Sequence, residues 1–86
     1  MAVVCVRGPL QKLAGDRREH QLEGATVAEL LRALEHVHPG VVGWILDERG
    51  LIRRHLNVFV NGDRAGEATA VRSRDRVEVV AAITGG

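Results

Sequence analysis

The sequence predicts one α+β domain in which a single main helix packs on one face of a mixed sheet of four to five strands. Two strongly apolar, strand-like segments lie at the two ends of the chain, and between them lies one clearly delimited helical pattern. An Asn-Gly turn signal follows a third strand-like segment. With 86 residues, the chain is long enough for one domain with a thin core, but not for two domains.

The first part of the chain predicts two antiparallel strands. Residues 1–7 contain a run of small and β-branched apolar residues, which is typical of a strand that is buried on both faces. Gly8-Pro9 ends this strand because proline cannot continue the hydrogen-bonded ladder. After a turn signal at residues 14–16, residues 17–23 predict a second, more exposed strand whose inner face carries His20 and Leu22.

The clearest pattern is an amphipathic helix that begins after residue 26. Thr26 can cap it, and Glu29, three residues later, completes a capping box. Pro39-Gly40 stops it. Each apolar side chain that the helix buries is expected to stabilise the fold by about 1.5–3 kcal/mol. The expected apolar stripe consists of Val27, Leu30, Leu31, Leu34 and Val37.

The second half of the chain predicts a short helix followed by three strands. Residues 41–48 suggest the short helix, and residues 54–61 a strand with Leu56, Val58 and Val60 on one face. Asn61-Gly62 signals a tight hairpin turn, with a short strand near Arg64. Residues 76–83 predict the last strand. Its inner face is expected to carry Val77, Val79, Ala81 and Ile83.

The order of these elements predicts a ubiquitin-like β-grasp arrangement. The first and last strands are the most apolar, and strands that are apolar on both faces belong in the middle of a sheet. We therefore expect them to lie side by side, with the helix across one face. The domain is expected to span residues 1–83, and residues 84–86 to form a flexible tail.

Composition narrows the possible functions. A net charge of +1 and only two aromatic residues, Trp44 and Phe59, argue against a nucleic-acid-binding surface. The single cysteine, Cys5, cannot form an internal disulfide or a multi-cysteine metal site, and we expect it to be a buried, inert thiol. No segment approaches membrane-spanning length and no signal peptide is evident, so we expect a cytoplasmic protein.

Three segments together resemble the ubiquitin-like sulfur-carrier family, the ThiS-, MoaD- and CysO-like proteins. They are the capped helix that begins Thr26-Val27-Ala28-Glu29, the strand and turn of residues 57–62, and residues 75–80 running toward Gly85-Gly86. Residues 38–53 look most like the longer carriers of the cysteine-synthesis type. The resemblance covers nearly the whole chain, and its segments are specific only as an ordered set.

The resemblance implies that Gly86 is adenylated and then converted to a thiocarboxylate, with Thr84 and Gly85 completing the tail. It implies two partners, an ATP-dependent adenylating and sulfur-loading enzyme and an acceptor enzyme that takes the sulfur. The acceptor belongs to cysteine, molybdopterin, thiamin or thio-metabolite synthesis, and the sequence leaves these alternatives open. The chain is then a co-substrate without a cofactor, not an enzyme, and is expected to be monomeric when free.

Strand alternation predicts a docking patch for the adenylating enzyme. Phe59 is expected to face away from the core, on the same outer face as Val80 and Ala82. A core position for Phe59 is the alternative. We expect Trp44 to cover the edge of the core, and the four histidines to be solvated or to lie at helix ends rather than to bind a metal.

Three other functions stay open at this point. The chain can be a protein modifier that is conjugated to lysines through Gly86. It can also be the small subunit of a two-subunit synthase, with its tail inserted permanently into the partner. A non-covalent β-grasp adaptor, which binds only through its surface, is the third.

Overall fold

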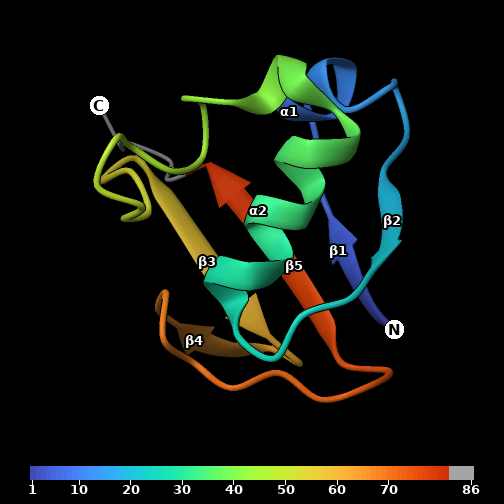
Figure 1. Cartoon of the computed structure of the whole chain (residues 1–86), viewed down its shortest axis with the longest axis vertical. Helices are drawn as coiled ribbons and strands as arrows, with labels where there is room; N and C mark the ends of the chain where they lie inside the picture. Colours follow the sequence, from blue (N-terminus) through green and yellow to red (C-terminus); the bar gives the residue numbers. More distant parts are fainter. Residues whose placement is uncertain (82–86) are drawn as a thin grey trace.

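The computed structural model describes residues 1–81, which form a five-stranded mixed sheet with helix α2 across one face (Figure 1). Its strand order is β2-β1-β5-β3-β4. β1 and β5 pair in parallel, whereas all other neighbours are antiparallel. This confirms the predicted β-grasp, with the first and last strands side by side. The strands are β1 (Ala2–Cys5), β2 (Glu19–Leu22), β3 (Leu56–Val60), β4 (Asp63–Ala65) and β5 (Arg76–Ala81).

The core lies between α2 and one face of the three inner strands. Val4 of β1 is in register with Val77 of β5, and Val58 of β3 with Val79 of β5. All four side chains are buried in one cluster beneath the helix. A parallel β1–β5 pair needs a crossover connection, and α2 lies within that connection and covers the sheet.

Helix α2 (Val27–Val37) begins as the sequence predicts. Thr26 Oγ1 accepts a hydrogen bond from Glu29 N at 3.2 Å. Glu29 Oε1 accepts one from Ala25 N at 2.9 Å, one residue earlier than the capping-box pattern expects. Four residues of the predicted stripe are fully buried, but Val37 is 57% exposed. The helix ends there, and in the 3₁₀ turn η1 (Pro39–Val41) that follows, the buried valine is Val41 instead.

The predicted hairpin turn at Asn61-Gly62 is confirmed. Asn61 has φ 50° and Gly62 has φ 88°, so both adopt the left-handed conformation that a two-residue hairpin loop requires. Val60 and Asp63 pair directly across the turn, which sets the β3–β4 register.

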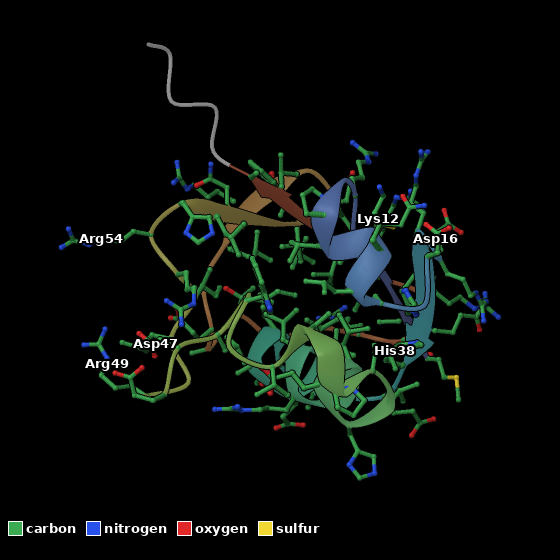
Figure 2. The ribbon with its side chains drawn as sticks, turned by 90° about the horizontal axis from the view of Figure 1, so that it is seen from above. Lys12, Asp16, His38, Asp47, Arg49 and Arg54 are labelled. Atoms are coloured by element: carbon green, nitrogen blue, oxygen red, sulfur yellow. The ribbon has the colours of Figure 1, made fainter. Side chains whose placement is uncertain are left out.

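Two local predictions were wrong. Helix α1 (Pro9–Leu13), a single turn that Pro9 begins and that buries Leu10, was not predicted. The helix predicted over residues 41–48 is absent: η1 ends at Val41, and Gly43 adopts φ 85°, which a right-handed helix does not allow. The carboxylate of Asp47 competes with helical hydrogen bonding, because its Oδ1 accepts from Arg49 N at 2.8 Å and from Leu51 N at 3.1 Å. Figure 2 shows Asp47 and Arg49 together on this loop.

No helix in the part of the chain that the structure describes is long and apolar enough to cross a membrane.

Candidate functional site

Strand β5 determines where the chain leaves the domain. It lies between β1 and β3, and its last residue, Ala81, is in register with Leu56, the first residue of β3. Ala81 was expected on the core face with Val77 and Val79, but it is exposed, because it lies at the end of the strand. The site residues predicted at Ala82, Thr84, Gly85 and Gly86 lie outside the described residues, and their roles stay predictions.

The open face of the sheet, opposite α2, carries the two described residues of the predicted docking patch. Phe59 is in register with Glu78 and Val80 with Asn57, so Phe59 and Val80 are diagonal neighbours on adjacent strands. Both side chains are half-buried and lie outside the core cluster. Their docking role stays a prediction.

Ion pairs lie beside this patch on the same face. Arg7 pairs with Glu78 at 3.2 Å, and Arg76 pairs with Glu19 at 3.1 Å. Arg76 also approaches Glu78 at 3.9 Å, which links the two pairs into one chain of charges that joins β2, β5 and Arg7, two residues beyond the end of β1. This network makes the part of the open face near β1 polar. Phe59 is in register with Glu78 of β5 and Arg64 of β4, so its apolar side chain is bordered by charged residues on both sides.

Cys5 is buried among these charged residues. Only 1% of its surface is exposed, and its neighbours in register are Glu19 on β2 and Glu78 on β5. Burial raises the pKa of the Cys5 thiol, and the nearby positive charge of Arg76 opposes this effect only in part. A buried thiol with a raised pKa is a poor nucleophile, which agrees with the expected inert cysteine.

A groove that the sequence analysis missed lies at the end of β5. It has a volume of about 350 Å³, and α1, Trp44, the start of β3 and the last three residues of β5 line it. Trp44 does not simply cover the core edge, since it is 52% exposed. The groove forms where α1, Trp44 and β5 come together, and these segments are distant in the chain. The sequence therefore offered no signal for the groove beyond the single tryptophan. Its apolar lining residues include Pro9, Leu10, Leu56, Val79 and Val80.

The four histidines differ in their surroundings. Within residues 1–81, no group of three or more histidine, cysteine or acidic side chains is arranged to hold a metal ion. His36 and His55 are exposed as expected, but His20 is buried on the core face of β2, with Nε2 2.8 Å from the carbonyl oxygen of Arg17. The rings of His20 and His38 meet edge to face at a centroid distance of 5.0 Å.

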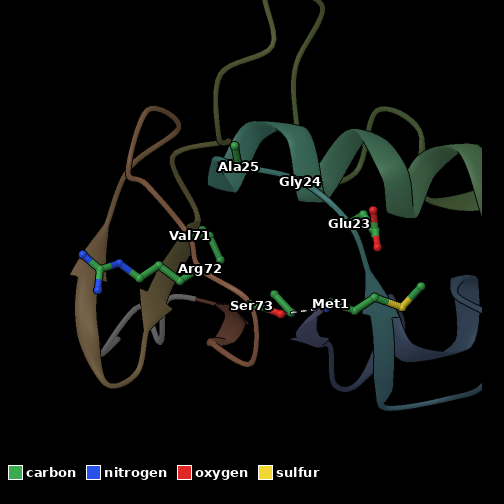
Figure 3. A pocket seen from close by; sticks show the side chains of 8 residues that line it. Met1, Glu23, Gly24, Ala25, Val71, Arg72 and Ser73 are labelled. Carbon is green, nitrogen blue, oxygen red and sulfur yellow. Dashed lines mark hydrogen bonds between the residues drawn. The ribbon is translucent and has the colours of Figure 1, made fainter.

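A larger hollow, of about 440 Å³, lies at the opposite end of the sheet (Figure 3). It lies where β1 starts, beside the loop that leads into β5, and the Met1 ammonium group donates a hydrogen bond of 3.0 Å to Ser73 Oγ there. Because β1 and β5 run in parallel away from this end, the hollow is remote from Ala81. It is therefore not part of the site at the end of β5.

Comparisons with known proteins identify the family. The sequence model of the ThiS family matches residues 4–86. Small archaeal modifier protein 3 of Haloferax volcanii is 35% identical over 68 residues, which cover 74% of this chain and 73% of that protein. A chain in the crystal structure of the Amycolatopsis orientalis BexX/CysO complex matches with a TM-score of 0.89 and 26% identity, covering 100% of both chains. The crystal structure of SAMP1 from Haloferax volcanii matches with a TM-score of 0.81 and 28% identity, covering 99% of this chain and 98% of that one.

The fold, the exit of the chain from β5 and a family match that extends to residue 86 agree with one another. The chain belongs to the ThiS family, the ubiquitin-like sulfur carriers that its sequence resembles.

Proposed function

We propose that this protein is a cytoplasmic sulfur carrier whose C-terminal Gly86 is converted to a thiocarboxylate that donates sulfur to a biosynthetic acceptor enzyme. The observation that carries the proposal is the ThiS-family match over residues 4–86, which includes the terminal Gly85-Gly86. The protein is a co-substrate of its partner enzymes, and its chemistry takes place at one end of the chain.

The proposed chemistry makes a poor electrophile reactive. A carboxylate oxygen of Gly86 attacks the α-phosphorus of ATP and pyrophosphate leaves, which gives an acyl-adenylate. Sulfide (HS⁻) from the sulfur source then attacks the acyl carbon, and AMP leaves with the oxygen that joined it to the acyl group. The product is the thiocarboxylate, in which one carboxylate oxygen is replaced by sulfur. Both steps are assigned to the adenylating and sulfur-loading enzyme.

The residue types at the end of the chain suit this role. Glycine has no Cβ, so Gly85 and Gly86 give a thin end that can enter a narrow active-site channel. Thr84 serves as a linker between these glycines and the domain. The folded domain contributes binding energy at a distance from the reacting atom.

The proposed docking surface for the adenylating enzyme is the apolar patch of Phe59, Val80 and Ala82. The first two lie on the open face, close to the end of β5. A contiguous exposed apolar patch often marks a protein interface.

A second candidate function is protein modification through Gly86. Two observations favour it: the 35% identical relative is a small archaeal modifier protein, and so is a 30% identical relative that covers 90% of this chain. Both functions use the same activated carboxyl group, but a modifier forms an amide with a lysine amine instead of a thiocarboxylate.

Intact-protein mass spectrometry tests the proposal. The chain is incubated with ATP, a sulfur source and the adenylating enzyme of the same organism, and is compared with the chain lacking Gly86. We expect a mass gain equal to the exchange of one oxygen for sulfur, mapped to Gly86 and absent from the truncated chain.

Other results would favour the other functions. Higher-mass conjugates that depend on Gly86 on a denaturing gel favour the modifier. Stable co-purification with one enzyme favours a synthase subunit. If the chain lacking Gly85 and Gly86 supports synthesis of the sulfur-containing product as well as the full chain does, the proposal is contradicted. That result favours a non-covalent adaptor.

A further inference from the structure

We propose that the Trp44 groove, defined by Trp44, Pro9, Leu10, Leu56 and Val79, binds an aliphatic or aromatic side chain that the adenylating enzyme presents within an acidic surface. This inference rests on the proposed function, because it names a contact of the enzyme that would act on Gly86. It adds a second docking surface to the patch around Phe59.

The groove is apolar and its aromatic residue is unusually accessible. A tryptophan with 52% of its surface exposed loses the stabilisation that burial would supply, and tryptophan is enriched among the residues that dominate binding energy at interfaces. A second hollow of about 290 Å³ is lined by Gly43, Trp44, Arg53 and His55. Trp44 and His55 line both hollows, so the indole ring is accessible from two sides.

The charges around the groove indicate the partner's chemistry. The charged or titratable residues that line the two hollows are Arg7, Arg53 and His55, and no described Asp or Glu lines either one. Arg7 already pairs with Glu78, whereas Arg53 makes no ion pair within residues 1–81. Arg54, which lies next to these residues in the sequence, points away from the body of the domain (Figure 2). A rim with this charge is complementary to carboxylates around an apolar side chain of the partner.

Chain length explains why the adenylating enzyme would reach this groove. Ala81 lines the groove and five residues follow it. At roughly 3.3–3.6 Å per residue, they span at most about 18 Å. An enzyme that holds the carboxyl group of Gly86 therefore lies within about that distance of Ala81, which brings the groove within its reach.

Kinetics of tail loading test the contact. We expect Trp44→Ala to lower kcat/KM for loading about tenfold or more, through a higher KM. Val37→Ala is the matched control, because Val37 is 57% exposed but lies outside the groove, and we expect it to stay within about twofold of wild type. His55→Glu should also raise KM, whereas the same change at the exposed His36 should not. Thermal melts verify that each variant is folded.

The single tryptophan permits a second measurement that does not depend on loading. Labelling with 5-fluorotryptophan gives one ¹⁹F resonance, which should shift when the unlabelled enzyme is added, also in the chain lacking Gly85 and Gly86. Normal loading of Trp44→Ala together with an unmoved resonance overturns the groove proposal and leaves the proposed function intact. If the wild-type chain is not loaded, the proposed function fails, and the resonance alone then decides whether the enzyme contacts the groove.

Discussion

The side-chain amide of Asn61 donates a hydrogen bond of 2.9 Å to Asp75, which joins the β3–β4 hairpin to the turn that leads into β5. Asn61 Oδ1 also accepts a hydrogen bond of 2.9 Å from Arg76 N. The same residue has φ 50°, which asparagine tolerates better than most residues do. One side chain therefore supports both the hairpin and the start of the strand that carries the chain out of the domain.

Replacing Asn61 should destabilise the fold measurably. We expect Asn61→Ala to lower the free energy of unfolding by about 2–4 kcal/mol. The change removes two hydrogen bonds, and alanine tolerates a positive φ less well than asparagine does. Asn61→Gly removes the same hydrogen bonds but relieves the backbone, so its loss should be smaller. Urea unfolding measures both, and equal losses for the two variants would show that the backbone conformation contributes nothing.

Acid should weaken the loop that Asp47 organises. The Arg49 guanidinium, followed by the backbone N–H of Leu51, lowers the pKa of Asp47 from 3.8 to about 2. A carboxyl group whose pKa is lower in the folded than in the unfolded state stabilises the fold at pH values above its unfolded-state pKa. This stabilisation is lost as the pH falls from about 4 to about 2. We expect Asp47→Asn to be less stable than wild type at pH 7, and the difference to shrink over that range.

Chemical denaturation of both proteins at pH 7, 4 and 2 provides this comparison. Asp63→Asn is the matched control, because Asp63 is exposed and makes no side-chain hydrogen bond within residues 1–81. A difference between Asp47→Asn and wild type that stays constant from pH 7 to pH 2 would contradict the prediction.

Phe59 should affect activation more than stability. Its side chain is half-buried on the open face, so we expect Phe59→Ala to fold and to lower kcat/KM for adenylation about tenfold, through weaker docking. Leu51→Ala, which shortens another partly exposed apolar side chain away from this face, should load normally. Pyrophosphate release assays compare the three proteins, and unchanged kinetics for Phe59→Ala would remove this face as a docking surface.

Cys5 should take no part in sulfur transfer. Because it is 1% exposed and burial raises its thiol pKa, we expect the Cys5→Ala protein to gain sulfur at the tail at the wild-type rate. We also expect the native protein to react slowly with a thiol reagent until it is denatured. Intact mass spectrometry before and after alkylation measures both effects, and sulfur loading that fails in Cys5→Ala would assign Cys5 a chemical role.

Local patterns predicted most of the regular structure. The stripe from Val27 to Leu34 and the alternation from Leu56 to Val60 each bury one face against the core, so their periodicity was visible in the sequence. The cap at Thr26 and the turn at Asn61-Gly62 depend only on neighbouring residues, and both formed as predicted. The helix predicted over residues 41–48 did not form, because Gly43 adopts φ 85° within this segment and the hydrogen bonds of Asp47 form a turn at its end.

The β-grasp fold, the Gly85-Gly86 pair and the alternation that directs Phe59 away from the helix could all be derived from the order of residues. Each of these depends on the period of a strand or helix, or on the order of residues along the chain. Packing in three dimensions surrounds Cys5 with charged residues of β2 and β5 and with Arg7, and it places Trp44 and Ala81 on the lining of one open groove. These contacts join segments that are distant in the chain, and no local pattern specifies how closely such segments pack.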